Sequence, residues 1–344
     1  MKAYEYIFAA IVMVAILMVA VHLTSMLPQL YMSISEVEQV KMAAQKVMTQ
    51  IILSPGDPED WGGNITVKAE DMTSFGLAVS TVYTRDVFIL DPDKVQRLSQ
   101  RIPADLFIPP HAVKMLLNLG FEYDIRMDFI PALTVTINRT SPNNIMINVS
   151  LEQGIPARNA KVTIGAILIE GEAIRIVDYK GVTDGNGHYN LRLNVSTPLL
   201  LVVADYHGVV RVVVKALGDV VAANFIGNSL IVGRAYQVSK IYQVFIIRHL
   251  DGSFNISHIR CENFTKTTAV NYDAYTMSSI EPNTILIVAL TGDGRLVAAW
   301  KDVPESYSTT TGETYSPLAY TLERNVKIEL SMYTFRLKIW RTSL

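Results

Sequence analysis

The feature that most constrains this chain is an apolar stretch near its N-terminus, residues 6–27, which reads YIFAAIVMVAILMVAVHLTSML. It contains one histidine, His22, and no formally charged side chain, so a helix of this length can cross a bilayer core of about 30 Å. The alternative is a cleaved secretory signal, which has a basic start, a shorter apolar core and a small-residue cleavage site. The stretch predicts an uncleaved single membrane span, with His22 at the membrane interface.

The charged residues that flank this stretch predict its orientation. Lys2 precedes it, whereas Glu36 and Glu38 follow it before Lys41 is reached. Basic flanks stay on the cytoplasmic side of a membrane. We therefore expect a single-pass protein of the cell membrane with a cytoplasmic N-terminus and an extracellular body, which could also stand in a cell-surface filament.

Helical periodicity continues beyond the apolar stretch, because apolar residues recur at steps of three and four up to residue 51. Ser54-Pro55-Gly56 ends the pattern, which predicts one helix over residues 3–53 within an N-terminal unit of residues 1–53. A proline inside this helix is expected to kink it. The buried stripe needs a partner, either the chain's own β domain or a neighbouring helix in an assembly. The candidate assembly residues are Pro28, Ile34, Val37, Val40, Ala44, Val47 and Ile51.

A connector with short helices is expected over residues 54–130. It opens with SPGDPEDWGG at residues 54–63, where two prolines and three glycines predict a fixed loop. Gly56, Pro58 and Trp61 are expected to fix the joint between the long helix and the head, with the tryptophan as packing anchor. Asp91 and Pro92 suit the N-cap and the first turn of a helix, which is predicted over residues 92–99. A second short helix is predicted over 110–118.

From about residue 122 the chain is rich in short β-branched runs separated by turn residues, which predicts strands. Asp184-Gly185-Asn186-Gly187 is a strong hairpin signal, since such turns need residues that tolerate positive φ. Strands every 8 to 12 residues predict an immunoglobulin-like β-sandwich over residues 131–216. Residues 217–344 form either a second β-rich domain or a sheet that completes the head. The expected fold class is mainly β, α+β overall, with a long N-terminal transmembrane and amphipathic helix.

Several function classes are disfavoured. The net charge of −2 gives no basic face for nucleic acid. Nucleotide-binding, serine-hydrolase and zinc-protease motifs are absent, and the six histidines do not fall at metal-ligand spacing. The lone Cys261 is interpreted as a packing residue, and Glu170, Glu172 and Asp178 as strand-surface residues rather than a catalytic pair. Asp184 fits hairpin chemistry better than calcium binding. We expect no enzyme, no cofactor and no metal.

Six N-x-S/T sequons follow the apolar stretch, and their position predicts an outward-facing, glycosylated surface. Ordinary use of asparagine in turns and strands is the plainer alternative. The candidate acceptors are Asn64, Asn138, Asn148, Asn194, Asn255 and Asn263.

The ordered set of an apolar helix, PGDPEDWG at 55–62, SFGLA at 74–78, LDPDKV at 90–95 and YTFRLKIW at 333–340 resembles uncharacterised archaeal membrane-anchored, pilin-like proteins. The resemblance covers roughly the first 100 and the last 30 residues. It implies export, a long N-terminal helix and a β-rich head. It also implies that Glu5 pairs with a neighbouring N-terminus during assembly. Residues 154–214 resemble an immunoglobulin-like or carboxypeptidase-regulatory-like sandwich at fold level.

The function expected from these features is that of a membrane-anchored structural or interaction protein, a surface or filament subunit that associates with itself or with other pilin-like surface proteins. The alternatives are a minor pilin-like component of a secretion or motility machine, or a membrane-tethered module that binds polysaccharide or cell wall. A cleft lined by Trp300 or Trp340 together with tyrosines would favour the binding module. A hydrolase would need His188, His207 or His258 beside paired carboxylates.

Overall fold

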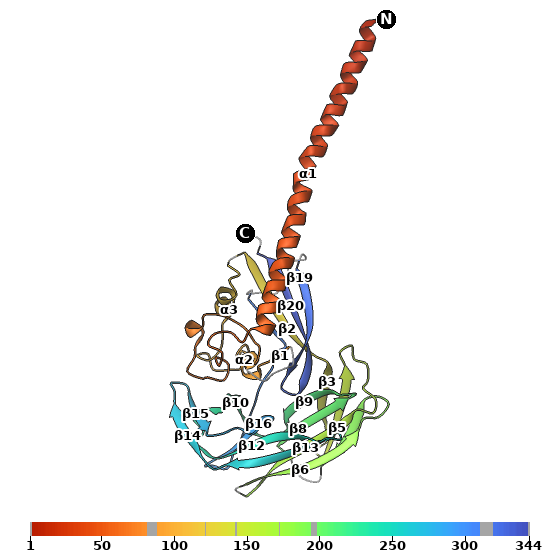
Figure 1. Ribbon diagram of the computed structural model, residues 1–344. Coiled ribbons are helices and arrows are strands. Elements are labelled where there is room, and N and C mark those ends of the chain that lie inside the picture. The colour runs from red at the N-terminus through yellow and green to blue at the C-terminus, as the bar shows by residue number, and fades with distance from the viewer. Residues whose placement is uncertain are drawn as a thin grey trace.

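The computed structural model describes residues 2–80, 88–120, 122–141, 143–171, 173–193, 198–309 and 319–342. Within the first helix, side chains 2–7, 9–11 and 23–36 lie outside the described part. The chain is mainly β with several sheets, as predicted, and one long helix extends from the body (Figure 1).

Helix α1 runs without interruption over Lys2–Leu53, which confirms the predicted helix. Its N-terminal part projects away from the body and its last turns enter it (Figure 1). The helix passes through Pro28, although the side chains of Glu5, Pro28 and Ile34 lie outside the described residues. Among the residues described, no helix contains a stretch that is long and apolar enough to cross a membrane.

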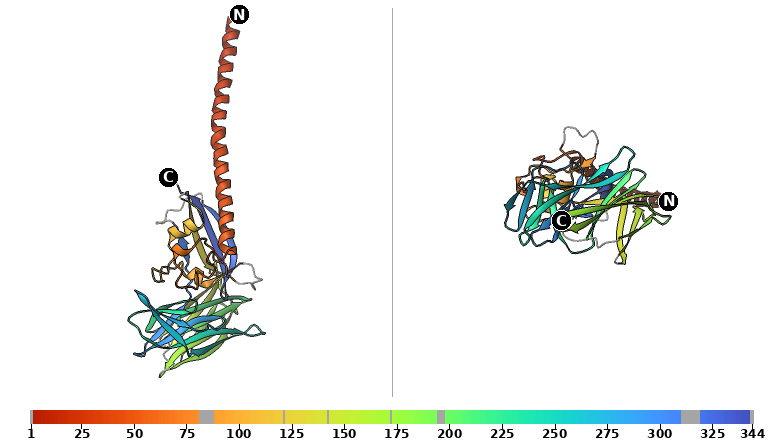
Figure 2. Two further views of the ribbon diagram at one scale, coloured as in Figure 1. Left: turned by 60° about the vertical axis from the view of Figure 1, so that its left-hand side comes forward. Right: turned by 90° about the horizontal axis from the view of Figure 1, so that it is seen from below.

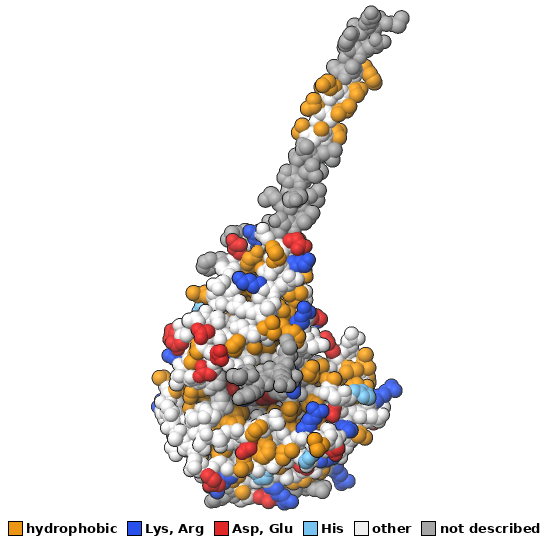
Figure 3. Space-filling model, viewed as in Figure 1, with side chains coloured by type: hydrophobic (Ala, Val, Ile, Leu, Met, Phe, Trp, Pro, Cys, Tyr) orange, Lys and Arg blue, Asp and Glu red, His pale blue; other side chains and the backbone are white. Residues whose placement is uncertain are grey.

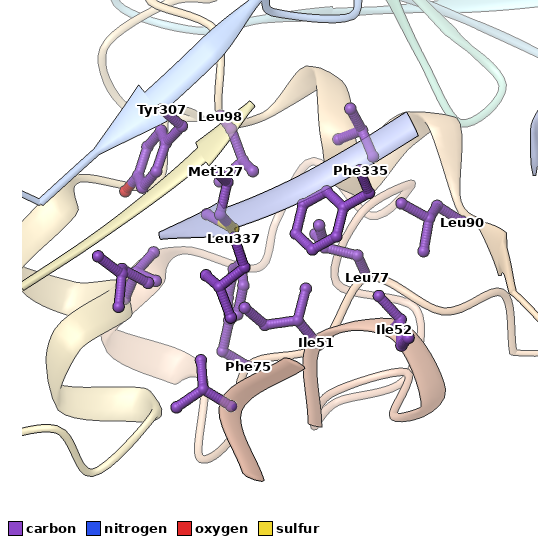
Figure 4. Close-up of a cluster of buried hydrophobic side chains, with 14 of the residues drawn as sticks. Ile51, Ile52, Phe75, Leu77, Leu90, Leu98, Met127, Tyr307, Phe335 and Leu337 are labelled. Atoms are coloured by element: carbon purple, nitrogen blue, oxygen red, sulfur yellow. The ribbon is translucent and has the colours of Figure 1, made fainter. Parts of the chain in front are cut away.

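The end of α1 packs on a five-stranded sheet of order β1-β19-β20-β2-β18. The fully buried Ile51 belongs to the same core as Phe335 and Leu337 of β20 and Met127 of β2 (Figure 4). Burial of an apolar side chain of this size stabilises a fold by about 1.5–3 kcal/mol. The strands are β1 (Ile89–Leu90), β2 (Tyr123–Pro131), β18 (Ser306–Ser308), β19 (Tyr320–Ile328) and β20 (Ser331–Arg341).

Short helices flank this sheet where the sequence predicts them. Helix α2 spans Pro92–Gln96, and its N-cap Asp91 accepts a hydrogen bond from the backbone N–H of Asp93. Helix α3 spans Pro110–Leu116, and a 3-10 turn η1 covers Ala69–Asp71. Proline at the first helical position of both α2 and α3 explains why each helix begins there, since its fixed φ suits the first turn.

The rest of the chain forms three stacked sheets at the end of the body away from α1 (Figure 2). The first has the order β3-β4-β7 and the second β6-β5-β8-β9, and their strands are β3 (Leu133–Ser141), β4 (Asn144–Leu151), β5 (Lys161–Glu170), β6 (Ala173–Val182), β7 (His188–Arg192), β8 (Leu199–Tyr206) and β9 (Val209–Ala216). The third has the order β13-β12-β16-β17-β10-β11-β15-β14, and its strands are β10 (Val220–Ile226), β11 (Ser229–Gly233), β12 (Val238–Arg248), β13 (Phe254–Cys261), β14 (Phe264–Thr268), β15 (Tyr272–Met277), β16 (Thr284–Thr291) and β17 (Leu296–Trp300).

The four-stranded sheet is covered on both faces. In β8, Leu200 and Val202 belong to the core shared with β3, β4 and β7, whereas Leu201 and Val203 belong to the core shared with β12 and β16. A strand buried on both faces reads as a continuous apolar run rather than an alternating one, which accounts for LLLVVA at 199–204. Residues 131–216 therefore share a core with the following β region.

The residues expected as one unit at 217–344 are divided between two sheets. Strands β10 to β17 build the eight-stranded sheet, whereas β18 to β20 return to the helix end and pair with β2 and β1. The chain thus closes beside α1 a sheet that it began before residue 131. This long-range pairing joins Tyr123 to Arg341 and Pro131 to Tyr333.

The predicted hairpin at Asp184–Gly187 is wrong as a pairing, although the turn itself is present. Strand β6 before it pairs with β5, and β7 after it pairs with β4 of another sheet. Asp184 Oδ1 accepts hydrogen bonds from the backbone N–H groups of Asn186 and His188. Turn residues specify local positive φ, as at Gly187, but they do not determine which strands become neighbours.

Candidate functional site

The projecting part of α1 carries exposed apolar side chains. Nine large hydrophobic residues between Phe8 and Val21 are exposed, at 41–70% of their full area. Figure 3 shows this apolar surface on the part of the projecting helix whose side chains are described. Apolar areas as continuous as this one are uncommon on the surfaces of monomeric proteins.

The C-terminal part of α1 has a different partner. Ala44, Val47 and Ile51 are buried in the core with β2 and β20, and Val40 packs partly against the same core. The sequence left open whether this stripe meets the chain's own head or a neighbouring helix, and the structure assigns these four residues to the head. Val37 remains 55% exposed and lies beyond the head's cover.

The link between α1 and the head, hereafter the joint, consists of residues 54–63, α2 and Arg97. Trp61 is fully buried at its centre and donates from Nε1 to the carbonyl oxygens of Pro55 at 3.1 Å and Gly76 at 3.3 Å. Gly56 has a φ of +79°, and an added Cβ would lie 2.8 Å from the tryptophan Nε1. The carbonyl of Pro58 accepts the Trp61 backbone N–H at 3.2 Å. The three predicted joint residues therefore meet in one place.

Arg97 is fully buried and holds the joint through backbone carbonyls. Its guanidinium donates to Leu106 O at 2.7 Å, to Val67 O at 2.6 Å and to Trp61 O. Its Cζ also lies 5.7 Å from the Trp61 ring centroid. Burial lowers the pKa of Arg97 to about 10, so the group remains cationic at neutral pH. One side chain thus ties three chain segments together.

Lys94 is the second buried cation of the joint. Its Nζ donates to Pro55 O at 2.8 Å and to Ala78 O at 2.9 Å, and Asp91 lies 3.9 Å away. Burial lowers the pKa of Lys94, and neighbouring carboxylates, Asp91 first, oppose that shift. The ammonium therefore connects the end of α1 to the strand-like segment near residue 78.

Helix α2 also connects the joint to the eight-stranded sheet. Asp93 accepts from Lys301 Nζ at 2.9 Å and from the Gly227 backbone N–H at 3.0 Å. Gln96 donates to Phe225 O at 2.7 Å and accepts from the Asp302 backbone N–H at 3.1 Å. The same five-residue helix therefore contacts the loop after α1 through Lys94 and the end of the eight-stranded sheet through Asp93 and Gln96.

Sequence reasoning located the joint but missed its cations. The sequence predicts a helix start at LDPDKVQRL, residues 90–98, and uses the segment as a resemblance motif, but it assigns no role to Lys94, Gln96 or Arg97. The available signal was the run of polar residues within a short helix next to a glycine-rich loop, because carbonyls in such a loop lack regular backbone partners and need donors.

The described sequons lie at the surface to differing degrees. Asn138 and Asn263 are exposed, whereas Asn64, Asn148 and Asn255 are partly buried, and Asn194 lies outside the described residues. Asn64 donates to Asp60 at 3.0 Å, and Asn255 contacts Lys180 and His249. The two exposed sites are therefore the most accessible acceptors among those described.

The residues considered for catalysis do not assemble into a recognisable site. His188 lies on β7, His207 in the turn after β8, and His258 on β13, so they come from three different sheets. Within the described residues, no group of three or more His, Cys, Asp or Glu side chains is placed to hold a metal ion. Cys261 is half-buried, and burial raises the pKa of its thiol.

The carboxylates that the sequence predicts to be strand-surface residues rather than a catalytic pair have separate surroundings. Glu170 forms an ion pair with Arg175 at 2.9 Å, whereas Glu172 lies outside the described residues. Burial raises the pKa of Asp178, which accepts a hydrogen bond from the Ile256 backbone of the neighbouring sheet. Each described carboxylate thus has a structural partner.

A scan of the chain against models of known protein families finds no match, and a search of curated protein sequences likewise finds none.

Proposed function

We propose that this chain is a membrane-anchored, extracytoplasmic structural or interaction protein of archaeal pilin-like type that serves as a surface or filament subunit. The observation that carries the proposal is the division of α1. Its C-terminal turns belong to the core of the head, whereas its N-terminal part projects with nine exposed large hydrophobic side chains.

Exposure of this apolar surface to water is unfavourable, so we expect another apolar surface to cover it. Full burial of a side chain such as valine, leucine or isoleucine is worth about 1.5–3 kcal/mol, so nine of them represent on the order of 10 kcal/mol. A lipid bilayer or a bundle of neighbouring helices supplies such an environment. In the membrane, the helix would be a single span with the head outside, as the flanking charges favour.

The joint supports a mechanical role. A flexible linker would let the head rotate freely, but Trp61, Lys94 and Arg97 bind the entering loop through backbone carbonyls, and Asp93 and Gln96 bind the head. The direction of α1 relative to the β-rich head is thereby defined. A defined angle suits a subunit whose heads must repeat in a regular array, and an immunoglobulin-like sandwich within residues 131–216 would provide the outward contact surface.

The resemblance to pilin-like proteins adds one assembly residue. In this proposal Glu5 pairs with the N-terminus of a neighbouring copy, and the apolar helices associate with one another. A minor pilin-like component of a secretion or motility machine would use the same parts at lower copy number.

The test places an epitope tag in the β12–β13 turn, at Asp251-Gly252, and follows the full chain in cells by immunogold electron microscopy and membrane fractionation. We expect label outside the cell, on filaments or on the membrane, and no extraction by alkaline carbonate. Labelled filaments that disappear in a Glu5→Gln variant, while the protein stays in the membrane, would support the filament subunit. Diffuse membrane label without filaments would refute the filament and leave the anchor. A wild-type chain found in the soluble cytoplasmic fraction would refute both.

A matched pair of variants makes the anchor test sharper. Leu17→Asp places a charge in the projecting apolar surface, and Gln45→Asp places one on an exposed helix position beside the head. A charge in a bilayer core costs about 2.5–3.5 kcal/mol on insertion scales. We expect Leu17→Asp alone to weaken membrane retention, and equal behaviour of the two variants would contradict a buried span.

A further inference from the structure

A cleft separates the five-stranded sheet from the β9 edge of the four-stranded sheet. It contains two cavities of about 960 and 420 Å³, and both are lined by Arg101, Arg211, Asp302, Val303 and Tyr333. These volumes fall within the range of about 300–1,000 Å³ that is typical of small-molecule sites. The cleft borders the joint at Pro92 of α2, but it has no part in the proposed anchoring.

Arg211 places a positive charge in this cleft, which is also lined by Asp302, Glu305 and Glu329. It extends from β9, donates from Nη1 to the Tyr333 hydroxyl of β20, and places its Cζ 4.8 Å from the Tyr333 ring centroid. Its buried Nε has no hydrogen-bond partner, and no carboxylate pairs with it within the described residues. By contrast, Arg101 pairs with Asp302 at 3.2 Å and Lys301 with Asp93 at 2.9 Å. An anion bound in the cleft would supply a negatively charged partner for the Arg211 guanidinium.

Glu329 gives the smaller cavity a carboxyl group that is an unusually weak acid. It lies in the turn between β19 and β20 and lines that cavity. Burial raises the pKa of Glu329 to about 7, with Lys301 lowering and Asp93 raising it. Its protonated form can donate a hydrogen bond, and it adds no negative charge that would repel an anionic ligand.

Aromatic side chains complete the lining. Trp300, at the end of β17, lines the smaller cavity, and Tyr333 lines both. Flat aromatic surfaces beside fixed polar groups suit ligands that present both C–H faces and hydroxyl groups. Asp302, which is held by Arg101 and by the Ser99 hydroxyl at 3.2 Å, offers a fixed acceptor for such hydroxyls.

From this arrangement we propose that the cleft binds an acidic saccharide, a sugar unit of the uronic-acid type, with its carboxylate toward Arg211, which rests on the buried Tyr333 ring, and with its own ring against Trp300. An acidic saccharide shares its anionic group with a free carboxylate or sulfate ion, but only the saccharide has a sugar ring that can contact the aromatic lining. This inference does not depend on the filament proposal, because a monomeric anchored head would present the same cleft.

The test measures binding of an oligomer of glucuronic acid to the detergent-solubilised full chain by isothermal titration calorimetry. Parallel titrations use a glucose oligomer of equal length, acetate and sulfate. We expect binding of the acidic oligomer only, with an affinity lowered at least about tenfold in Arg211→Gln, because a charge-assisted hydrogen bond is lost. The matched control is Arg175→Gln, an exposed arginine on β6, which removes the same charge away from the cleft.

A second readout follows from Glu329. The affinity of the wild-type chain should fall as the pH rises through about 7, because deprotonation of Glu329 places a negative charge beside the bound carboxylate. The charges that act most directly on Glu329 are those of Lys301 and Asp93, and Glu329→Gln should flatten this dependence. The other titratable side chains that line the same cavity are Arg101, Arg211, Lys215, Asp302 and Tyr333. Circular dichroism of each variant verifies that the fold is intact.

The outcomes separate cleanly. Binding that is lost in Arg211→Gln and kept in Arg175→Gln supports the site. Equal binding of acetate, sulfate and the acidic oligomer would overturn the saccharide and leave a simple anion site. No binding of the acidic oligomer to the wild-type chain, or equal loss in the two arginine variants, would overturn the proposal.

Discussion

Replacing Arg97 with leucine removes the donor that three closely bonded carbonyls of the joint share. Each buried carbonyl left without a partner costs about 1–3 kcal/mol, which sums to roughly 3–9 kcal/mol. Two effects reduce this sum, because the variant no longer buries a charge and water can reach some of the freed carbonyls. We therefore expect a net loss of about 3–5 kcal/mol, the range found when one partner of a buried charged network is removed.

The assay is urea unfolding of the full chain in detergent, followed by tryptophan fluorescence, since the Trp61 ring lies 5.7 Å from the Arg97 guanidinium. The control is Arg101→Leu, four residues later. Arg101 is 77% exposed, and its surface ion pair with Asp302 is worth at most about 1 kcal/mol. If Arg97→Leu unfolds at the same urea concentration as Arg101→Leu, the carbonyl network does not stabilise the joint and the reasoning fails.

Three further predictions concern the same body. Ile51→Ala should destabilise the helix–sheet core by about 2–5 kcal/mol, whereas Met42→Ala, at a position 60% exposed, should change stability by less than about 0.5 kcal/mol in urea unfolding. Gly76→Ala should cost at least about 2 kcal/mol and lower the thermal midpoint, because an added Cβ would lie 2.1 Å from a backbone carbonyl oxygen; Gly185→Ala, which faces open space, should be neutral. The pKa of Glu329 is raised from 4.5 to about 7, so its protonated form contributes to the free energy of unfolding fully below pH 4.5, and this contribution is lost as the pH rises through about 7. Glu329→Gln should remove up to about 3 kcal/mol of this pH dependence. An unchanged pH profile of the unfolding free energy would contradict the assignment.

Local signals in the sequence predict the elements well where a single segment carries all the information. The α1 boundary follows from periodicity that stops at Ser54-Pro55, and α2 and α3 follow from prolines that suit a first helical turn. The joint at Gly56, Pro58 and Trp61 also follows from local composition, because a glycine- and proline-rich loop with one tryptophan has few other ways to be anchored. The strand-rich texture after residue 122 predicts a mainly β body for the same reason.

What the sequence by itself determined is therefore the long helix, the joint's position and the β character of the head. Only the tertiary structure decided that β20 returns to pair with β2, that Asp184–Gly187 crosses between sheets, and that Arg97 and Lys94 serve the joint. It also placed Arg211 and Tyr333 side by side from strands more than 100 residues apart in the chain. The physical reason is that periodicity and turn chemistry act over a few residues, whereas strand partners and buried charges depend on which distant surfaces meet and exclude water.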